Sequence, residues 1–191
     1  MKKVLIILLG ILFMATPACA LNFENSHTYR YDIRGDDGGD IYLVKGTLSH
    51  KLPIEKINRD LKLGVFIEGG YDFDPEDFQL SKAGGLASIN LVKWLSLTED
   101  IYYSDKPQDT YWRSNLTASF PFEVFELNPS LKIFEEYRFN IDEGEGARND
   151  VGVGVEVPLT EIFKCYLGWR HADRIHSFDT DYVETKVTLS F

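Results

Sequence analysis

The end of the chain constrains the fold most strongly, because polar and apolar side chains alternate there up to the last residue. Val183, Val187, Leu189 and Phe191 share one parity with Thr185, and the residues between them are polar or charged. Successive side chains of a β-strand point to opposite faces, so this segment is predicted to be a strand with one apolar face. A strand edge that no other strand covers promotes aggregation. A closed barrel has no such edge, and lipid around the barrel would cover the apolar face.

A final strand that ends in phenylalanine, with apolar residues at every second position before it, resembles the closing strand of bacterial outer-membrane β-barrels. The resemblance implies that Val183, Val187, Leu189 and Phe191 are the signal for the barrel-assembly machinery during insertion. It also implies outer-membrane lipid and lipopolysaccharide as the surroundings of the barrel. The resemblance is to the class as a whole and indicates no particular family.

The start of the chain predicts export. Lys2 and Lys3 precede an apolar run over residues 4–14, and an Ala-x-Ala site follows at residues 18–20. A basic start, a short apolar core and a small-residue site are typical of a secretory signal peptide, which we expect to be cleaved after Ala20. The apolar run is too short for a membrane helix, which needs about 20 residues.

Cleavage at this site would leave a signal peptide over residues 1–20 and a single transmembrane β-barrel domain over residues 21–191. The alternative is a lipoprotein signal cleaved before Cys19, although the residues that precede this cysteine match a lipobox poorly. We expect the exported protein to reside in the outer membrane of a Gram-negative-type cell.

The composition excludes several function classes. The chain has 20 Lys and Arg against 30 Asp and Glu, a formal net charge of -10, and this acidity argues against nucleic-acid binding. After the signal peptide only Cys165 remains, which rules out an intrachain disulfide and a cysteine-rich metal site. The sequence has no nucleotide, flavin or haem motif, so we predict no cofactor and no resident metal.

Segments of alternating polarity recur between turn signals and predict ten strands, with eight or twelve as alternatives. The predicted strands are 27–34, 40–51, 61–73, 81–92, 95–104, 110–121, 131–140, 150–158, 164–174 and 182–191. A tilted strand needs about 9–11 residues to cross a bilayer. The predicted fold is therefore all-β, an antiparallel transmembrane up-and-down β-barrel. A soluble β-sandwich or lipocalin-like barrel also alternates, but it would place its apolar face inside.

Two kinds of connection alternate along the chain. One kind is acidic, at residues 35–39, 74–77, 105–109 and 142–149. The other is short and amphipathic, at residues 53–54, 92–94, 121–122 and 158–159. An even number of strands places both termini on one side, which we expect to be the periplasm, so the acidic loops would face outside. Their carboxylates are ligands suited to divalent cations, which could bridge them to lipopolysaccharide phosphates.

The polar parity of the strands predicts a charged lumen. Its expected lining residues are Arg30, Arg34, Lys62, Glu68, Arg113, Arg138, Glu156, Arg170, Arg174, Glu184 and Lys186. The same parity also places Lys45, Asp100 and Glu136 inside. Charges inside a barrel are tolerated only when they pair with one another. Either salt bridges fill the interior, as in barrels of about eight strands, or a narrow charged path selects solutes.

Glu99 and Glu135 depart from the pattern, because their parity points them toward lipid. A carboxylate that faces hydrocarbon is unfavourable, although less so than Lys or Arg. One explanation is a β-bulge beside each residue that reverses the parity. The other is a polar patch for a partner subunit or for catalysis on lipid.

No catalytic set reaches motif quality, and the weak candidates are His171, Asp173, His176 and Ser177. A Ser, a His and an acid at the outer rim could hydrolyse lipid or peptide. This arrangement resembles the outer-membrane lipid A deacylases and the omptin proteases in location only. His176 and Ser177 are adjacent and no Asn follows them, so the deacylase motif is absent. A solvated loop is the better explanation of these residues.

The predicted function is therefore a structural, surface or narrow passive-transport role of the porin-like kind, without chemistry of its own. The alternative is an outer-membrane lipid-modifying hydrolase with a site at the extracellular rim.

Overall fold

The computed structural model describes residues 21–34, 39–54, 59–73, 81–105, 107–124, 127–173 and 179–191. Its strands are β1 (Asn22–Asp32), β2 (Ile41–Ile54), β3 (Arg59–Asp72), β4 (Ser81–Val92), β5 (Leu95–Ser104), β6 (Asp109–Pro121), β7 (Ser130–Asn140), β8 (Glu145–Pro158), β9 (Phe163–Asp173) and β10 (Thr180–Ser190). Among the described residues, no helix is long and apolar enough to cross a membrane.

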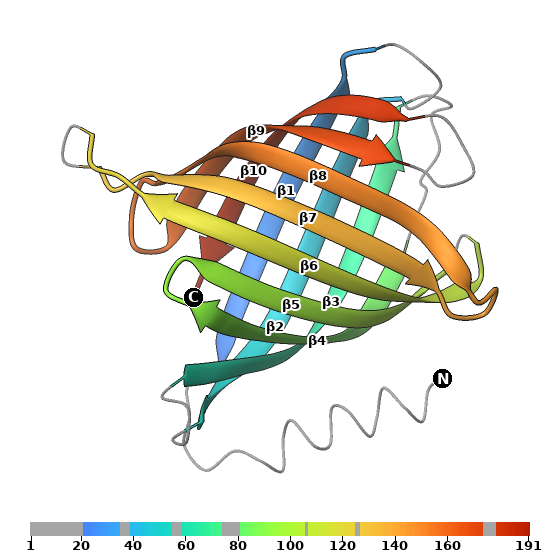
Figure 1. The fold of residues 1–191 in the computed structure, drawn as a ribbon, viewed down its shortest axis with the longest axis horizontal. Helices are drawn as coiled ribbons and strands as arrows, with labels where there is room; N and C mark the ends of the chain where they lie inside the picture. The colour runs from blue at the N-terminus through green and yellow to red at the C-terminus, as the bar shows by residue number, and fades with distance from the viewer. Residues whose placement is uncertain are drawn as a thin grey trace.

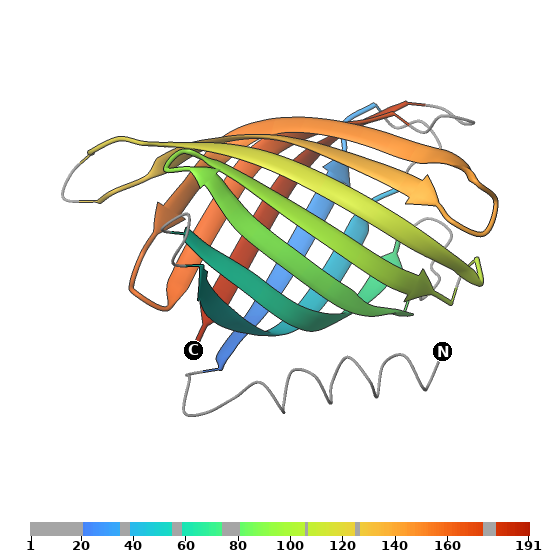
Figure 2. The same cartoon turned by 60° about the horizontal axis from the view of Figure 1, so that its bottom comes forward.

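The strands form one closed antiparallel barrel, in which each strand pairs with its neighbours in the chain and β1 pairs with β10 (Figure 1). The prediction of an all-β up-and-down barrel of ten strands is confirmed. The strands cross the molecule obliquely, and the β6–β7 hairpin extends beyond its neighbours in both views (Figures 1 and 2). An isolated bridge between Val124 and Leu127 continues this hairpin past the strands.

The barrel has two distinct ends. The start of β1 and the end of β10 lie at what we call the terminal end, where the Phe191 N–H donates to the Phe23 carbonyl at 2.8 Å. The β2–β3, β4–β5, β6–β7 and β8–β9 connections also lie there. The other five connections lie at the opposite end, which we call the loop end. All of these except the β9–β10 connection overlap the acidic segments of the sequence.

Two strands begin five residues earlier than the sequence predicted, since β1 starts at Asn22 and β8 at Glu145. Neither added segment alternates in polarity. Backbone pairing supplies the stability instead, because Glu24 lies between Thr47 and Ser190, and Glu145 pairs with Asn140. The polar composition of these segments therefore misled a prediction that depended on side-chain periodicity.

The barrel is apolar outside and polar inside. Ile67, Ile101 and Leu167 point outward and are 69%, 59% and 59% exposed. By contrast, Asp150 and Arg170 are 0% and 4% exposed. A soluble barrel would have the opposite distribution, because its apolar faces form the core. The alternative of a soluble sandwich or lipocalin-like barrel is therefore wrong.

Candidate functional site in the barrel interior

Charged side chains from every strand meet inside the barrel, and we call this set the charge layer. It consists of Arg30, Lys45, Glu68, Lys82, Asp100, Arg113, Glu136, Arg138, Arg148, Asp150, Arg170 and Glu184. These side chains are between 0% and 24% exposed. Because an isolated buried charge is unstable, the layer depends on its internal pairing.

Arg170 is the centre of this pairing. Its guanidinium lies 2.7 Å from the Asp150 carboxylate, 3.0 Å from Glu136 and 3.2 Å from Glu184. It thereby connects β9 to β7, β8 and β10. Asp150 also pairs with Arg148, so several guanidinium groups share one fully buried carboxylate.

A glycine makes room for Arg170. Gly152 is in register with Arg170 on one side and with Phe134 on the other. A Cβ atom at Gly152 would overlap the Phe134 ring. The Arg170 guanidinium lies 5.0 Å from the centroid of this ring, a favourable cation–π distance. The glycine thus allows an aromatic ring and a long cationic side chain to pack on the inner face.

A second group of cations packs on aromatic rings beside β4. Phe66 and Tyr102 are both in register with Gly84, and their ring centroids are 6.1 Å apart. Lys45 lies 4.1 Å from the Phe66 centroid, and Arg113 lies 5.3 Å from that of Tyr102. Arg113 also pairs with Asp100, so its charge is balanced by an acid as well as by the rings.

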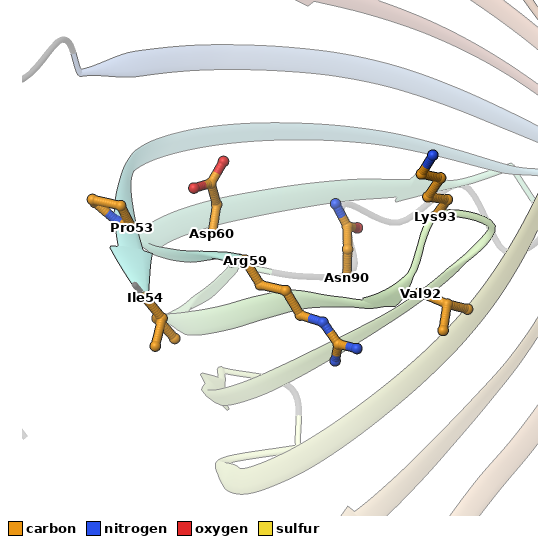
Figure 3. A pocket seen from close by; sticks show the side chains of 7 residues that line it. All are labelled: Pro53, Ile54, Arg59, Asp60, Asn90, Val92 and Lys93. Carbon is orange, nitrogen blue, oxygen red and sulfur yellow. The ribbon is translucent and has the colours of Figure 1, made fainter. Parts of the chain in front are cut away.

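Cavities lie toward both ends of the barrel. At the loop end, a cavity of about 170 Å³ lies against the charge layer, between Arg30, Lys82 and Arg148. At the terminal end, a cavity of about 660 Å³ is lined by residues of β2, β3 and β4 and of the turn after β4 (Figure 3). Arg59, Asp60, Asn90 and Lys93 contribute polar side chains to this second cavity.

The structure places most of the predicted lining residues on the inner face. Arg30, Glu68, Arg113, Arg138, Arg170 and Glu184 belong to the charge layer. Nearer the terminal end, Lys62 lies 3.9 Å from Glu24, and Glu156 lies 3.5 Å from Lys132. Lys186 has the same inward parity as Glu184. Arg174 lies outside the described residues.

Arg34 differs from the expectation. It lies beyond the end of β1, and its guanidinium donates to Asp181 at the rim. Asp181 alternates with the inward Thr180 and Tyr182, so it has outward parity. The predicted strand extended to residue 34, whereas β1 ends at Asp32, and this difference removes Arg34 from the inner face.

Three members of the charge layer were missed by the sequence analysis, namely Lys82, Arg148 and Asp150. Asp150 and Arg148 continue the inward parity of Gly152 and Glu156, so extending the strand toward Glu145 would have found them. Lys82 occupies the second position of β4 and pairs with Glu68 at 2.8 Å. Its inward parity was visible, but its acidic partner on β3 could not be identified without the register.

The weak catalytic candidates do not form a hydrolytic site in the described residues. His171 points outward, and its Nδ1 lies 2.9 Å from Asp181, to which Arg34 also donates. Asp173 is exposed at the end of β9. His176 and Ser177 lie outside the described residues. The hydrolase alternative therefore gains no support.

Glu99 and Glu135 keep their outward parity. Strand pairing is regular at both residues, and the register shifts lie elsewhere, near Asn90 and Arg138. The explanation by β-bulges is therefore wrong. The Glu99 carboxylate accepts hydrogen bonds from the Trp112 indole at 2.5 Å and the Ser114 hydroxyl at 2.8 Å.

The closing strand ends as its sequence pattern indicated. Val183, Val187 and Leu189 have outward parity in β10, while Phe191 follows the strand and is 65% exposed.

No described group of histidine, cysteine or acidic side chains is arranged to hold a metal ion.

Comparison with known proteins supports the fold. No protein-family model and no curated protein sequence matches the chain. The structure is similar to the COG4313 outer membrane channel from Pseudomonas putida F1, with a TM-score of 0.53, 8% identity, and coverage of 93% of this chain and 97% of that chain. A KdgM porin matches with a TM-score of 0.48, 12% identity, and coverage of 89% and 99%. The chain has the fold of a small outer-membrane β-barrel. These similarities identify no specific family.

Proposed function

We propose that the protein is a porin-like barrel of the outer membrane that passes small solutes along its charged interior and has no chemistry of its own. The observation that carries this proposal is the kind of group that fills the barrel interior. In the described part of the chain, the charge layer consists of side chains from the barrel wall, with a cavity on each side of it. Long Arg and Lys side chains can change rotamer, so such a layer restricts passage without requiring a backbone movement.

The test is single-channel conductance of the refolded barrel in a planar bilayer. We expect small discrete current steps from the wild type, because rotamer changes of the long side chains in the layer would open a narrow path. The double variant Lys82→Ala and Glu68→Ala removes a pair at 2.8 Å and leaves neither partner alone, so it should enlarge the steps. The matched control removes Lys132 and Glu156, a pair at 3.5 Å outside the layer, and should change the steps little.

Absence of current steps from both the correctly folded wild type and the double variant would contradict transport. The barrel would then have a structural or surface role, which is the second candidate. The dense pairing around Arg170 favours that candidate, since a guanidinium with three acidic partners resists displacement.

The cellular placement is part of the same proposal. We expect cleavage after Ala20, both termini in the periplasm, and the acidic loops at the cell surface among lipopolysaccharide and divalent cations. Supporting features are the basic and apolar start of the sequence and the shared location of the start of β1 and the end of β10. N-terminal sequencing of the mature protein tests the cleavage, and protease treatment of intact cells tests the orientation.

A further inference from the structure

The cavity at the loop end has an unusual lining for a space inside an acidic protein. Five cationic side chains line it, namely Arg30, Lys82, Arg113, Arg138 and Arg148. Two acidic side chains, Glu68 and Asp72, also line it. The lining therefore has an excess of positive charge, although the whole chain has a formal net charge of -10.

Most of the acids that balance these cations lie away from the cavity, and Glu68, the partner of Lys82, is the exception. Arg30 pairs with Glu184 at 2.7 Å and Arg138 pairs with Glu136 at 2.5 Å, and neither acid lines the cavity. Asp150, the partner of Arg148, does not line it either. These three pairs are thus oriented with their positive partners toward the cavity. Such an arrangement attracts an anion even though the charge layer is close to neutral.

Arg148 has an unused donor at this place. Its Nε donates to Asp150, while its Nη2 is buried and has no hydrogen-bond partner. The side chain is 12% exposed. A buried guanidinium nitrogen without an acceptor is unfavourable. Because the Arg148 side chain lines the cavity, a rotation of the guanidinium that brings this nitrogen to an acceptor bound there would stabilise it.

We propose that this cavity binds a small oxyanion, a carboxylate or phosphate group, with Arg148 as its principal ligand. Planar guanidinium groups bind two oxygens of a carboxylate or phosphate at once, which favours an oxyanion over a halide. The volume of about 170 Å³ admits several water molecules or one compact anion and excludes a long chain. The site goes beyond the proposed function, because it requires the folded barrel but not conduction.

The test is the effect of inorganic phosphate on unfolding of the refolded barrel in zwitterionic detergent. Chloride replaces phosphate at equal ionic strength, so general screening stays constant. A ligand that binds only the folded state raises the urea midpoint with its concentration, and this dependence gives an apparent affinity. We expect phosphate to stabilise the wild type, and acetate to do so more weakly.

The deciding variant is Arg148→Gln, which leaves Asp150 paired with Arg170 at 2.7 Å. Loss of one charged donor should weaken the apparent phosphate affinity on the order of tenfold. The control is Arg59→Gln, an exposed residue in the cavity at the other end (Figure 3), and it should keep the wild-type affinity. If Arg148→Gln does not refold, Leu43→Glu provides a second test, because it adds a carboxylate to the lining without removing a pair. That variant should also lose the phosphate response.

Absence of any phosphate effect on the wild type would overturn the proposal and indicate that water alone fills the cavity. An equal loss in Arg148→Gln and Arg59→Gln would also overturn it, since the effect would then come from general charge. Neither result depends on conductance, so failure of this proposal is distinguishable from failure of the proposed transport.

Discussion

Replacement of Asp150 by asparagine should destabilise the barrel more than replacement of any acid outside the charge layer. Asp150 is 0% exposed and accepts hydrogen bonds from Arg148 and Arg170. Asparagine preserves the shape but removes the negative charge. Breaking a buried ion pair in this way destabilises proteins by about 3–5 kcal/mol, because the remaining partner is left buried and unpaired.

The structure narrows the expected loss in the free energy of unfolding. In Asp150→Asn, Arg170 keeps Glu136 at 3.0 Å and Glu184 at 3.2 Å, whereas Arg148 loses the acid to which its Nε donates. The loss therefore corresponds to one unpaired guanidinium, and we expect about 3 kcal/mol. If this reasoning is correct, adding Arg148→Gln to Asp150→Asn should recover much of the lost stability, because it removes the unpaired charge.

The assay is urea unfolding of the refolded barrel in detergent or lipid vesicles, followed by tryptophan fluorescence. Glu156→Gln serves as the control, because Glu156 and Lys132 are 29% and 23% exposed and 3.5 Å apart. Such a pair contributes about 0–1 kcal/mol. Equal losses in Asp150→Asn and Glu156→Gln, or a double variant no more stable than Asp150→Asn, would refute the argument.

Two further substitutions test the packing of the barrel strands and the outer face of the barrel. Gly84→Val should destabilise the barrel by about 1–3 kcal/mol or prevent refolding, because a Cβ atom at Gly84 overlaps Tyr102. The control Gly46→Val should be tolerated, because the nearest atom to a Cβ at Gly46 is 3.8 Å away. Equal unfolding curves for the two variants would contradict this. Glu135→Leu should stabilise the barrel in lipid vesicles, since Glu135 is exposed on the outer face and its carboxylate accepts from Asn149 at 3.4 Å. Vesicle unfolding measurements that show a loss would indicate that this carboxylate has a partner in the membrane.

The fold was predictable from the sequence because period-two polarity determines strands wherever lipid covers one face. β4 and β5 match their predicted bounds for this reason. The same argument failed at the start of β1 and β8, where backbone pairing and not side-chain contrast holds the strand. Parity alone also placed Glu99 and Glu135 correctly, and the bulges offered to explain them were wrong.

The charge layer was only partly predictable. Inward parity identified Arg113 and Arg170 as residues of the inner face. It could not show that Arg170 reaches acids on three other strands, because diagonal contacts depend on the stagger between strands. It also could not show the cavity beside Arg148, since the space depends on how the long side chains of several strands fold over one another.

The pairing of β1 with β10 has a consequence for the order of assembly. β1 and β10, the two strands of the barrel farthest apart in the sequence, are the partners that close the ring, and the backbone of Phe191 itself bonds to Phe23. Without β10 the outer edges of β1 and β9 have no strand partner, so the ring stays open until β10 is in place. Contacts between the two ends of a chain also form slowly. A barrel of this kind must therefore be kept from aggregating until β10 has paired with both β9 and β1, and closure is a single late step of folding.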